Sequence, residues 1–258
     1  MLFHVNAFHL DIDSKGKTWW HSLAPRTRLL CTILIVFAIG LTPNGRWWTW
    51  AIYTIGVLSV VLISRITLSV LLKRIAVEFA FIGTVLLGTL FRGGGEVVAS
   101  LGPLKITSVG LMVLGSVTTK ALLCLIMLNL LTLTTSIPAL LNALVVLRVP
   151  RLLVATLASM YRYISVLIGE FNAMRRAAAS RNFKGDNRWQ RQILGNMFGS
   201  LFIRTYERGD RVYQAMLARG YQGVPPVFDL PSGSSRDIIA LTLTFILALL
   251  GQVIYLQW

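Results

Sequence analysis

Two seven-residue segments, 38 positions apart, share one pattern of small, basic and aromatic residues. Segment 177–183 reads Ala-Ala-Ala-Ser-Arg-Asn-Phe, and segment 215–221 reads Ala-Met-Leu-Ala-Arg-Gly-Tyr. Glycine or asparagine after a helix favours the left-handed conformation that ends it, and small residues let another backbone approach closely. An arginine at that point can bind a carboxylate with two parallel hydrogen bonds. The pattern predicts recognition of an acidic surface, although two ordinary helix ends would share it.

No set of residues predicts a catalytic, nucleotide or metal site. Gly16-Lys17-Thr18 resembles the end of a phosphate-binding loop, but that loop needs glycine where this chain has Asp11. The residues His4, His9, Asp11 and Asp13 lack the spacing of a compact ligand set. No nucleophile, base and acid stand in a plausible enzyme arrangement. We therefore expect a non-catalytic chain that binds neither a cofactor nor a metal.

Glu78 and Lys120 fall inside apolar runs, where charges are costly and are functional candidates by default. At about 1.5 Å per helical residue, Glu78 lies roughly 10 Å from one membrane face and Lys120 nearer the middle. A direct pair would need a tilted helix or a long reach. We favour structural contacts for both, between helices or with a partner subunit.

The composition is that of a membrane protein. Of 258 residues, 55% are hydrophobic and 14% charged, against about 25% charged in soluble domains. The net charge of +15 then reflects membrane topology or an acidic partner or lipid, and we expect no nucleic acid. Disordered, collagen-like and disulfide-rich secreted proteins are excluded. Cys31 and Cys124 lie in apolar runs, which favours neither a disulfide nor a metal site.

Five apolar runs predict membrane-spanning helices, and they cover residues 29–41, 47–63, 71–91, 106–135 and 238–258. The first is short for about 30 Å of hydrocarbon. Between the third and fourth runs we expect a glycine-rich loop. The N-terminal part shows no signal-peptide pattern. The predicted fold is an all-α integral membrane protein of about five spans, with a pair of long, crossed amphipathic helices inserted before the last span.

The distribution of basic residues predicts the orientation. The stretch 148–219 holds 13 of the 25 basic residues and four acidic ones. Because cytoplasmic loops are enriched in lysine and arginine, we place this stretch and the N-terminus in the cytoplasm. The predicted divisions are an N-terminal segment, a four-span region, a cytoplasmic module and a final span, at residues 1–28, 29–135, 136–230 and 238–258.

The cytoplasmic module contains three helix signals. Thr134 to Pro138 is typical of a helix start, and Pro150 precedes a second, longer helix. Apolar residues in that second helix alternate in steps of four and three, which predicts a packing stripe; they are Leu153, Leu157, Met160, Ile164, Leu167, Phe171 and Met174. A membrane span over 152–168 is the alternative, although Arg162 at its middle would be costly in lipid.

A third helix is predicted from about Asn187 to Arg219. Two apolar rows with a spacing of four residues form one wide face, and they contain Trp189, Ile193, Met197 and Leu201, and Leu194, Phe198, Phe202 and Tyr206. Basic residues fall largely on the other face. Such a helix lies on a membrane surface or packs against a neighbouring helix.

These features resemble the transmembrane T component of energy-coupling factor transporters, most closely the CbiQ type associated with cobalt uptake. The resemblance covers most of the chain and is most specific over 134–223. It is carried by the two arginine-tipped helix ends and by Pro25-Arg26, Thr134-Thr135, Pro150, Met160-Tyr161-Arg162-Tyr163-Ile164, Glu170, Met174 and Gly199–Arg208.

The resemblance implies two coupling helices that dock into a pair of ABC ATPases, which hydrolyse ATP, and a separate membrane subunit that binds the metal ion. It places this chain in a bacterial inner membrane. The first helix end departs from the family's Ala-Arg-Gly pattern, with serine for alanine and asparagine for glycine. The docking residues it implies are Ala177, Ser180, Arg181, Asn182, Ala215, Ala218, Arg219 and Gly220.

Three alternatives remain open on the sequence. The same scaffold could serve nickel or a vitamin. A membrane-embedded enzyme acting on lipids would need acids or histidines clustered at the interface, and none stands out. A lipid-sensing scaffold would use the basic helices to hold anionic headgroups.

Overall fold

The computed structural model describes residues 18–45, 47–90, 97–101, 104–181, 187–222 and 234–257. The chain divides into two compact units, residues 1–143 with 230–258, and residues 144–229. The predicted N-terminal segment is described from Thr18 onward. Each unit is a separate set of packed helices, and we describe them in turn.

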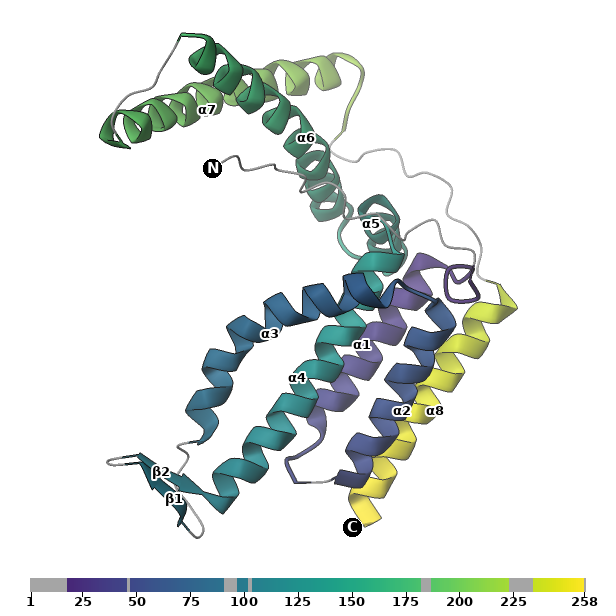
Figure 1. Cartoon of the computed structure of the whole chain (residues 1–258). Coiled ribbons are helices and arrows are strands. Elements are labelled where there is room, and N and C mark those ends of the chain that lie inside the picture. Colours follow the sequence, from purple (N-terminus) through teal and green to yellow (C-terminus); the bar gives the residue numbers. More distant parts are fainter. Residues whose placement is uncertain are drawn as a thin grey trace. The chain divides into compact units, whose positions relative to one another are not determined.

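The first unit contains five long helices, and Figure 1 shows four of them, α1, α2, α4 and α8, running side by side. Helix α3 packs along α4. The helices are α1 (Pro25–Leu41), α2 (Trp47–Ser64), α3 (Leu68–Leu90), α4 (Ser108–Thr134) and α8 (Ser235–Gln257). They cover the five predicted spans, so the all-α membrane fold is confirmed.

The ends of these helices follow from their sequences. Helix α1 begins at Pro25, where the missing N–H would be unsatisfied in any case. Helix α4 begins after Thr107, whose hydroxyl accepts a hydrogen bond from the Gly110 N–H. Residues 106 and 107 therefore lie before the helix, which corrects the predicted start of the fourth span.

A short β-hairpin replaces the loop expected between the third and fourth spans. Strands β1 (Val97–Leu101) and β2 (Leu104–Thr107) pair antiparallel, with Leu101 opposite Leu104. Glycine in the 93–95 stretch suggested a loop, whereas the β-branched pairs Val97-Val98 and Ile106-Thr107 favour strands. The hairpin was missed because its strands are only four to five residues long, and Gly93, Gly94 and Gly95 lie outside the described residues.

Length and composition alone make four of the described helices able to cross a membrane: α2, α4, α6 (Arg151–Ser180) and α8 up to Val253. Helix α1 has 17 residues, and α3 carries Lys73, Arg74 and Glu78. Helix α6 meets the criterion although we predicted it to lie in the cytoplasmic module. Hydropathy therefore leaves the alternative span over 152–168 open.

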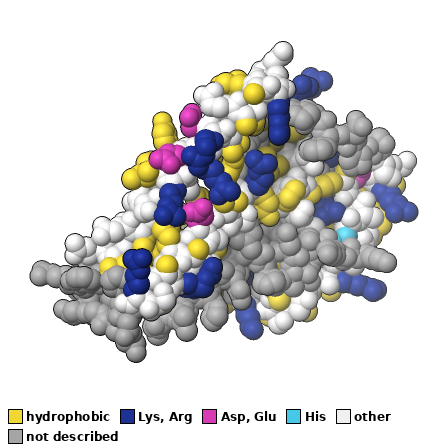
Figure 2. Space-filling model, turned by 90° about the horizontal axis from the view of Figure 1, so that it is seen from above, with side chains coloured by type: hydrophobic (Ala, Val, Ile, Leu, Met, Phe, Trp, Pro, Cys, Tyr) yellow, Lys and Arg dark blue, Asp and Glu magenta, His cyan; other side chains and the backbone are white. Residues whose placement is uncertain are grey.

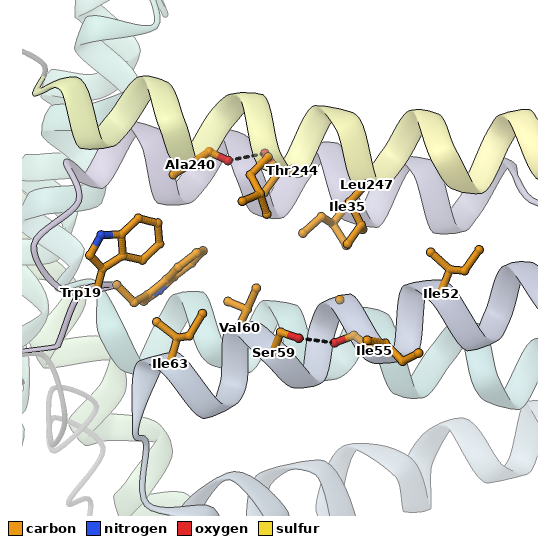
Figure 3. A pocket seen from close by; sticks show the side chains of 13 residues that line it. Trp19, Ile35, Ile52, Ile55, Ser59, Val60, Ile63, Ala240, Thr244 and Leu247 are labelled. Atoms are coloured by element: carbon orange, nitrogen blue, oxygen red, sulfur yellow. Dashed lines mark hydrogen bonds between the residues drawn. The ribbon is translucent and has the colours of Figure 1, made fainter.

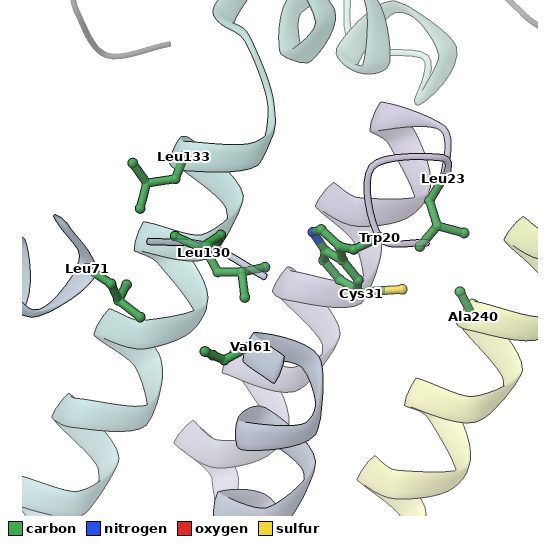
Figure 4. Close-up of a cluster of buried hydrophobic side chains, with 9 residues drawn as sticks. Trp20, Leu23, Cys31, Val61, Leu71, Leu130, Leu133 and Ala240 are labelled. Atoms are coloured by element: carbon green, nitrogen blue, oxygen red, sulfur yellow. The ribbon is translucent and has the colours of Figure 1, made fainter. Parts of the chain in front are cut away.

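Two apolar clusters hold the first unit together. One joins Trp20, Cys31, Val61, Leu130 and Ala240, with further apolar residues around them, and Figure 4 shows these side chains converging from several helices. The other is built around the fully buried side chains of Ile39, Tyr53, Val57 and Met127. Each cluster draws on α1, α2, α4 and α8, which fixes these helices as one bundle.

Glycine allows α2 and α8 to approach closely. A Cβ at Gly56 would overlap the Leu247 side chain, and a Cβ at Gly251 would overlap the Tyr53 ring. In a membrane, helices associate by such close contact because lipid is as apolar as the side chains. The two contacts set the distance between α2 and α8.

The two intramembrane charges make structural contacts. The Asn129 amide on α4 donates to the Glu78 carboxylate on α3 at 2.6 Å. The Lys120 ammonium lies 5.5 Å from the centroid of the Trp50 ring, a cation–π distance. Contacts between helices are therefore present at both residues, as we expected, and Glu78 and Lys120 have different partners.

The second unit contains the helix pair α6 and α7 (Asn187–Ala218), preceded by α5 (Ile137–Val146), which lies at the boundary of the units. Pro138 stands in the first turn of α5, and Pro150 directly precedes α6. Both proline signals therefore marked real helix starts. Figure 1 shows α6 and α7 crossing one another.

Candidate functional site

Among the described side chains, an aromatic pair and an ion pair join α6 and α7 at their crossing. The rings of Phe171 and Phe198 stack with centroids 5.2 Å apart and planes 24° from parallel. The Arg208 guanidinium lies 3.5 Å from the Glu170 carboxylate. Because that ion pair is largely exposed, it contributes little stability, and the ring stack supplies an apolar contact at the crossing.

Helix α7 ends in a complete glycine cap with Arg219 at the C-cap position. Gly220 has φ +81°, its N–H donates to the Leu217 carbonyl, and the Tyr221 N–H donates to the Met216 carbonyl. These two bonds define the Schellman motif. The predicted cap conformation is present, and it satisfies two carbonyls that the helix end would leave unpaired.

Helix α6 places Arg181 at the matching position. This residue is also the C-cap, with φ −84° and ψ 12°, and its N–H donates to the carbonyls of Ala178 and Ala179. The Ser180 hydroxyl donates to the Ala177 carbonyl at 2.9 Å, so it is turned toward its own helix. Asn182 lies outside the described residues.

The two arginines therefore occupy equivalent places, one residue after the end of a long helix. Both are exposed, as are Ala177, Ser180, Ala215 and Ala218 around them. In Figure 1 the C-terminal ends of α6 and α7 lie on different sides of the crossing. Two separate partner surfaces can reach them.

The predicted stripe on α6 divides into two parts. Leu167, Phe171 and Met174 are half-buried, whereas the first four residues are 42–57% exposed; they are Leu153, Leu157, Met160 and Ile164. The second part lies at the crossing with α7. The first part is apolar surface that the described residues leave uncovered.

The apolar face of α7 divides in the same way. Ile193, Met197 and Leu201 are half-buried, while the parallel row is 42–74% exposed; it contains Leu194, Phe198, Phe202 and Tyr206. The side chain of Trp189 lies outside the described residues. Exposed apolar surface on both helices is typical of a protein or membrane contact.

Basic side chains dominate the polar surface of the helix pair. Arg204, Arg208 and Arg211 follow one another at helical spacing around a depression that also contains Glu170 and Glu207. Figure 2 shows basic side chains standing among apolar ones, with few acidic side chains between them. The only ion pair of Arg211 among the described residues is with Glu207, at 3.8 Å.

Metal ligands do not gather in the part of the chain that the structure describes, where no three His, Cys, Asp or Glu side chains are close enough to share an ion. His4, His9, Asp11 and Asp13 lie outside it, as does most of the Gly16-Lys17-Thr18 motif. His21 is hydrogen-bonded to the Thr18 hydroxyl at 2.6 Å.

The family model of the cobalt transport protein CbiQ matches residues 16–228, which include both arginine-tipped helix ends. The chain belongs to the CbiQ family. It is thus a membrane component of an energy-coupling factor transporter and a multi-pass membrane protein, as the resemblance implied.

Relatives of this CbiQ-family chain carry related names. The energy-coupling factor transporter transmembrane protein EcfT 1 of Listeria monocytogenes is 31% identical over 81% of this chain and 82% of its own length. EcfT of Streptococcus equi is 29% identical over 91% of both chains. A putative fused cobalt transport protein CbiMQ of Methanocorpusculum labreanum is 29% identical over 76% of this chain and 33% of its own length.

Sequence patterns did not identify the crossing point. Phe198 was assigned to a row of α7, and Phe171 to the stripe of α6, but nothing in the sequence paired them. Glu170 and Arg208 stand 38 positions apart, the same interval that separates Arg181 from Arg219. That shared interval does not predict contact, because Phe171 and Phe198, which do stack, are separated by a different interval.

Proposed function

We propose that this chain is the energy-coupling subunit of an ATP-driven metal-ion importer, placed in a bacterial inner membrane with its N-terminus and the helix pair α6–α7 in the cytoplasm. Its partners are two ABC ATPase subunits and a membrane subunit that binds the ion. The observation that carries the proposal is the matched, exposed C-cap position of Arg181 and Arg219.

Each arginine would insert into an acidic groove on one ATPase. The negative end of the helix dipole lies beside it, and a guanidinium can bind a carboxylate bidentately. Small residues at Ala177, Ala215 and Ala218 would let the ATPase backbone approach. ATP binding and hydrolysis belong to the partners, and this chain contributes no catalytic group or cofactor.

Closure of the ATPases would move the two helix ends relative to each other. Because the helices touch at Phe171 and Phe198, the crossing would act as the pivot. The exposed apolar residues of α6 and α7 would then transmit this movement to the ion-binding subunit, through contacts outside the hydrocarbon layer of the membrane. A ligand shifts such an equilibrium only through contacts that differ between its states, and the arginine contacts supply that difference.

Cobalt is the cargo that we favour. The matching family is described as a cobalt transport protein, and the fused relative from Methanocorpusculum labreanum has cobalt in its name. The EcfT relatives' names specify no cargo. Nickel or a vitamin is the alternative, and the metal content of cells that express the complete transporter distinguishes them.

Charge reversal at the helix ends tests the docking. Arg219→Glu should reduce co-purification of the ATPase subunits and cobalt uptake by at least tenfold, because it places two carboxylates in contact at a desolvated site. Arg181→Glu should act in the same direction. Arg204→Glu on α7 is the matched control. Unchanged co-purification and uptake in the Arg219 variant would exclude the assignment.

A further inference from the structure

An apolar groove runs between α2 and α8 in the first unit, and its volume is about 340 Å³. Figure 3 shows its side chains converging from the two helices, with Trp19 at one end near Ala240. Gly56 lies in its wall, at the point where Leu247 approaches α2 most closely. The groove is therefore the space left on one side of the α2–α8 contact.

The two hydroxyl groups in the groove do not make it polar. The Ser59 hydroxyl donates to the Ile55 carbonyl at 2.7 Å, and the Thr244 hydroxyl donates to the Ala240 carbonyl at 3.0 Å. Both donors are thus satisfied by their own helices, which leaves carbon facing the space. An apolar chain fits this lining, and water has few partners in it.

The tryptophans place one end of the groove at the expected membrane interface. Trp19 is 42% exposed at that end, and Trp47 and Trp48 are exposed at the opposite end of α2. Tryptophans gather at both interfaces of a bilayer. The Thr18 hydroxyl donates to the Ser64 carbonyl at 3.4 Å, which joins the turn containing Trp19 to the last turn of α2.

A cationic side chain lies at the Trp19 end of the groove. Arg236 is exposed and lies four residues before Ala240 on α8, on the helix face that lines the groove. The neighbouring Asp237 is buried, and its oxygens accept from the N–H groups of Ala24 and Ser234. Among the described residues Arg236 forms no ion pair, so its charge can bind an anion from the interface.

We propose that this groove binds one anionic phospholipid, with an acyl chain between α2 and α8 and the phosphate at Arg236. The apolar lining and the interfacial tryptophan select a lipid, and the cation selects an anionic headgroup. Neither observation involves the coupling helices, so the proposal stands independently of the transport function.

Native mass spectrometry of the full chain in detergent, titrated with palmitoyl-oleoyl phosphatidylglycerol or the matching phosphatidylcholine, tests the site. We expect one retained phosphatidylglycerol and weaker retention of phosphatidylcholine. Arg236→Gln should lower the preference for phosphatidylglycerol about fivefold, the effect of one cation near an anionic headgroup. Lys73→Gln on α3 is the charge control and should leave the preference unchanged.

Phenylalanine substitutions that fill the groove show whether the retained lipid is bound there. Ser59→Phe and, from the opposite wall, Leu243→Phe should each remove the retained lipid, while Leu58→Phe, at an exposed position of α2 that does not line the groove, should not. Equal retention in the filled variants, or no preference between the two lipids, overturns the proposal. A cross-link from a groove residue to a partner membrane protein in the purified transporter also overturns it, because the groove is then a subunit contact.

Discussion

At the scale of single residues, Arg28 makes the densest polar contacts in the described chain. It is buried, and its guanidinium donates to the carbonyls of His21, Leu23 and Thr134 and to the Thr135 hydroxyl. These contacts join the turn before α1 to the end of α4. No carboxylate lies among these partners. The buried positive charge is therefore stabilised by hydrogen bonds to carbonyl and hydroxyl oxygens.

Removing the Arg28 guanidinium should destabilise the first unit. Arg28→Met leaves several buried carbonyls without donors, which we expect to cost about 3 kcal/mol. For a chain of this size that corresponds to a fall of roughly 10 °C in the thermal unfolding midpoint in detergent. Lys73→Met, on the exposed part of α3, is the control. A midpoint within 2 °C of the unmodified chain, measured to about that precision, would contradict this account.

At the scale of elements, the helix ends carry more information than the helix interiors. Asp237 accepts hydrogen bonds from Ser234 at its own helix start and from Ala24 at the start of α1. One carboxylate thus satisfies donors at the N-termini of two helices, where negative charge is favoured. Ala24 cannot cap α1 with its own side chain, so the cap comes from another helix.

Gly220 allows a direct test of the glycine cap at the end of α7. Its φ of +81° is strained for a residue with a Cβ, so Gly220→Ala should destabilise the end of α7 by about 1 kcal/mol. Hydrogen exchange at the Tyr221 amide should then accelerate about fivefold. Gly209→Ala, in the middle of α7, should instead slow exchange in α7, since alanine is the better helix former. Equal effects of the two substitutions would argue against the glycine cap.

At the scale of the whole molecule, the chain combines a helical membrane unit with a unit of two long crossed helices. The first unit has two buried apolar clusters, whereas α6 and α7 leave much apolar surface exposed. Two helices that leave so much apolar surface exposed can change their crossing angle without opening a large buried core. This arrangement suits a part that moves when its partners move.

The stack of Phe171 on Phe198 should couple the two helices in both stability and transport. Phe171→Ala and Phe198→Ala should be coupled by about 1 kcal/mol in a double-mutant cycle, because both remove the same stack. In the transporter each should lower cobalt uptake while the ATPase subunits still co-purify through Arg181 and Arg219. Phe202→Ala, on the exposed row of α7, is the control for the stability measurement only, because its ring is not part of the stack. Additive effects on stability would show that the stack is not the pivot.

The sequence determined the elements and the helix ends, because these depend on local chemistry. Pro138 and Pro150 set helix starts, Gly220 sets a left-handed cap, and the apolar runs predict the membrane helices. The Arg181 and Arg219 segments were visible for the same reason. The β-hairpin was missed because its strands are short.

Tertiary structure alone decided which faces meet. The partners of Arg28 lie up to 107 positions away, and Phe171 stacks on Phe198, a pairing that periodicity does not define. A repeat of apolar residues predicts a packing face but not its partner, because hydrophobic burial has no direction. The groove between α2 and α8 has the same origin, since it depends on how closely Gly56 and Gly251 let two distant helices approach.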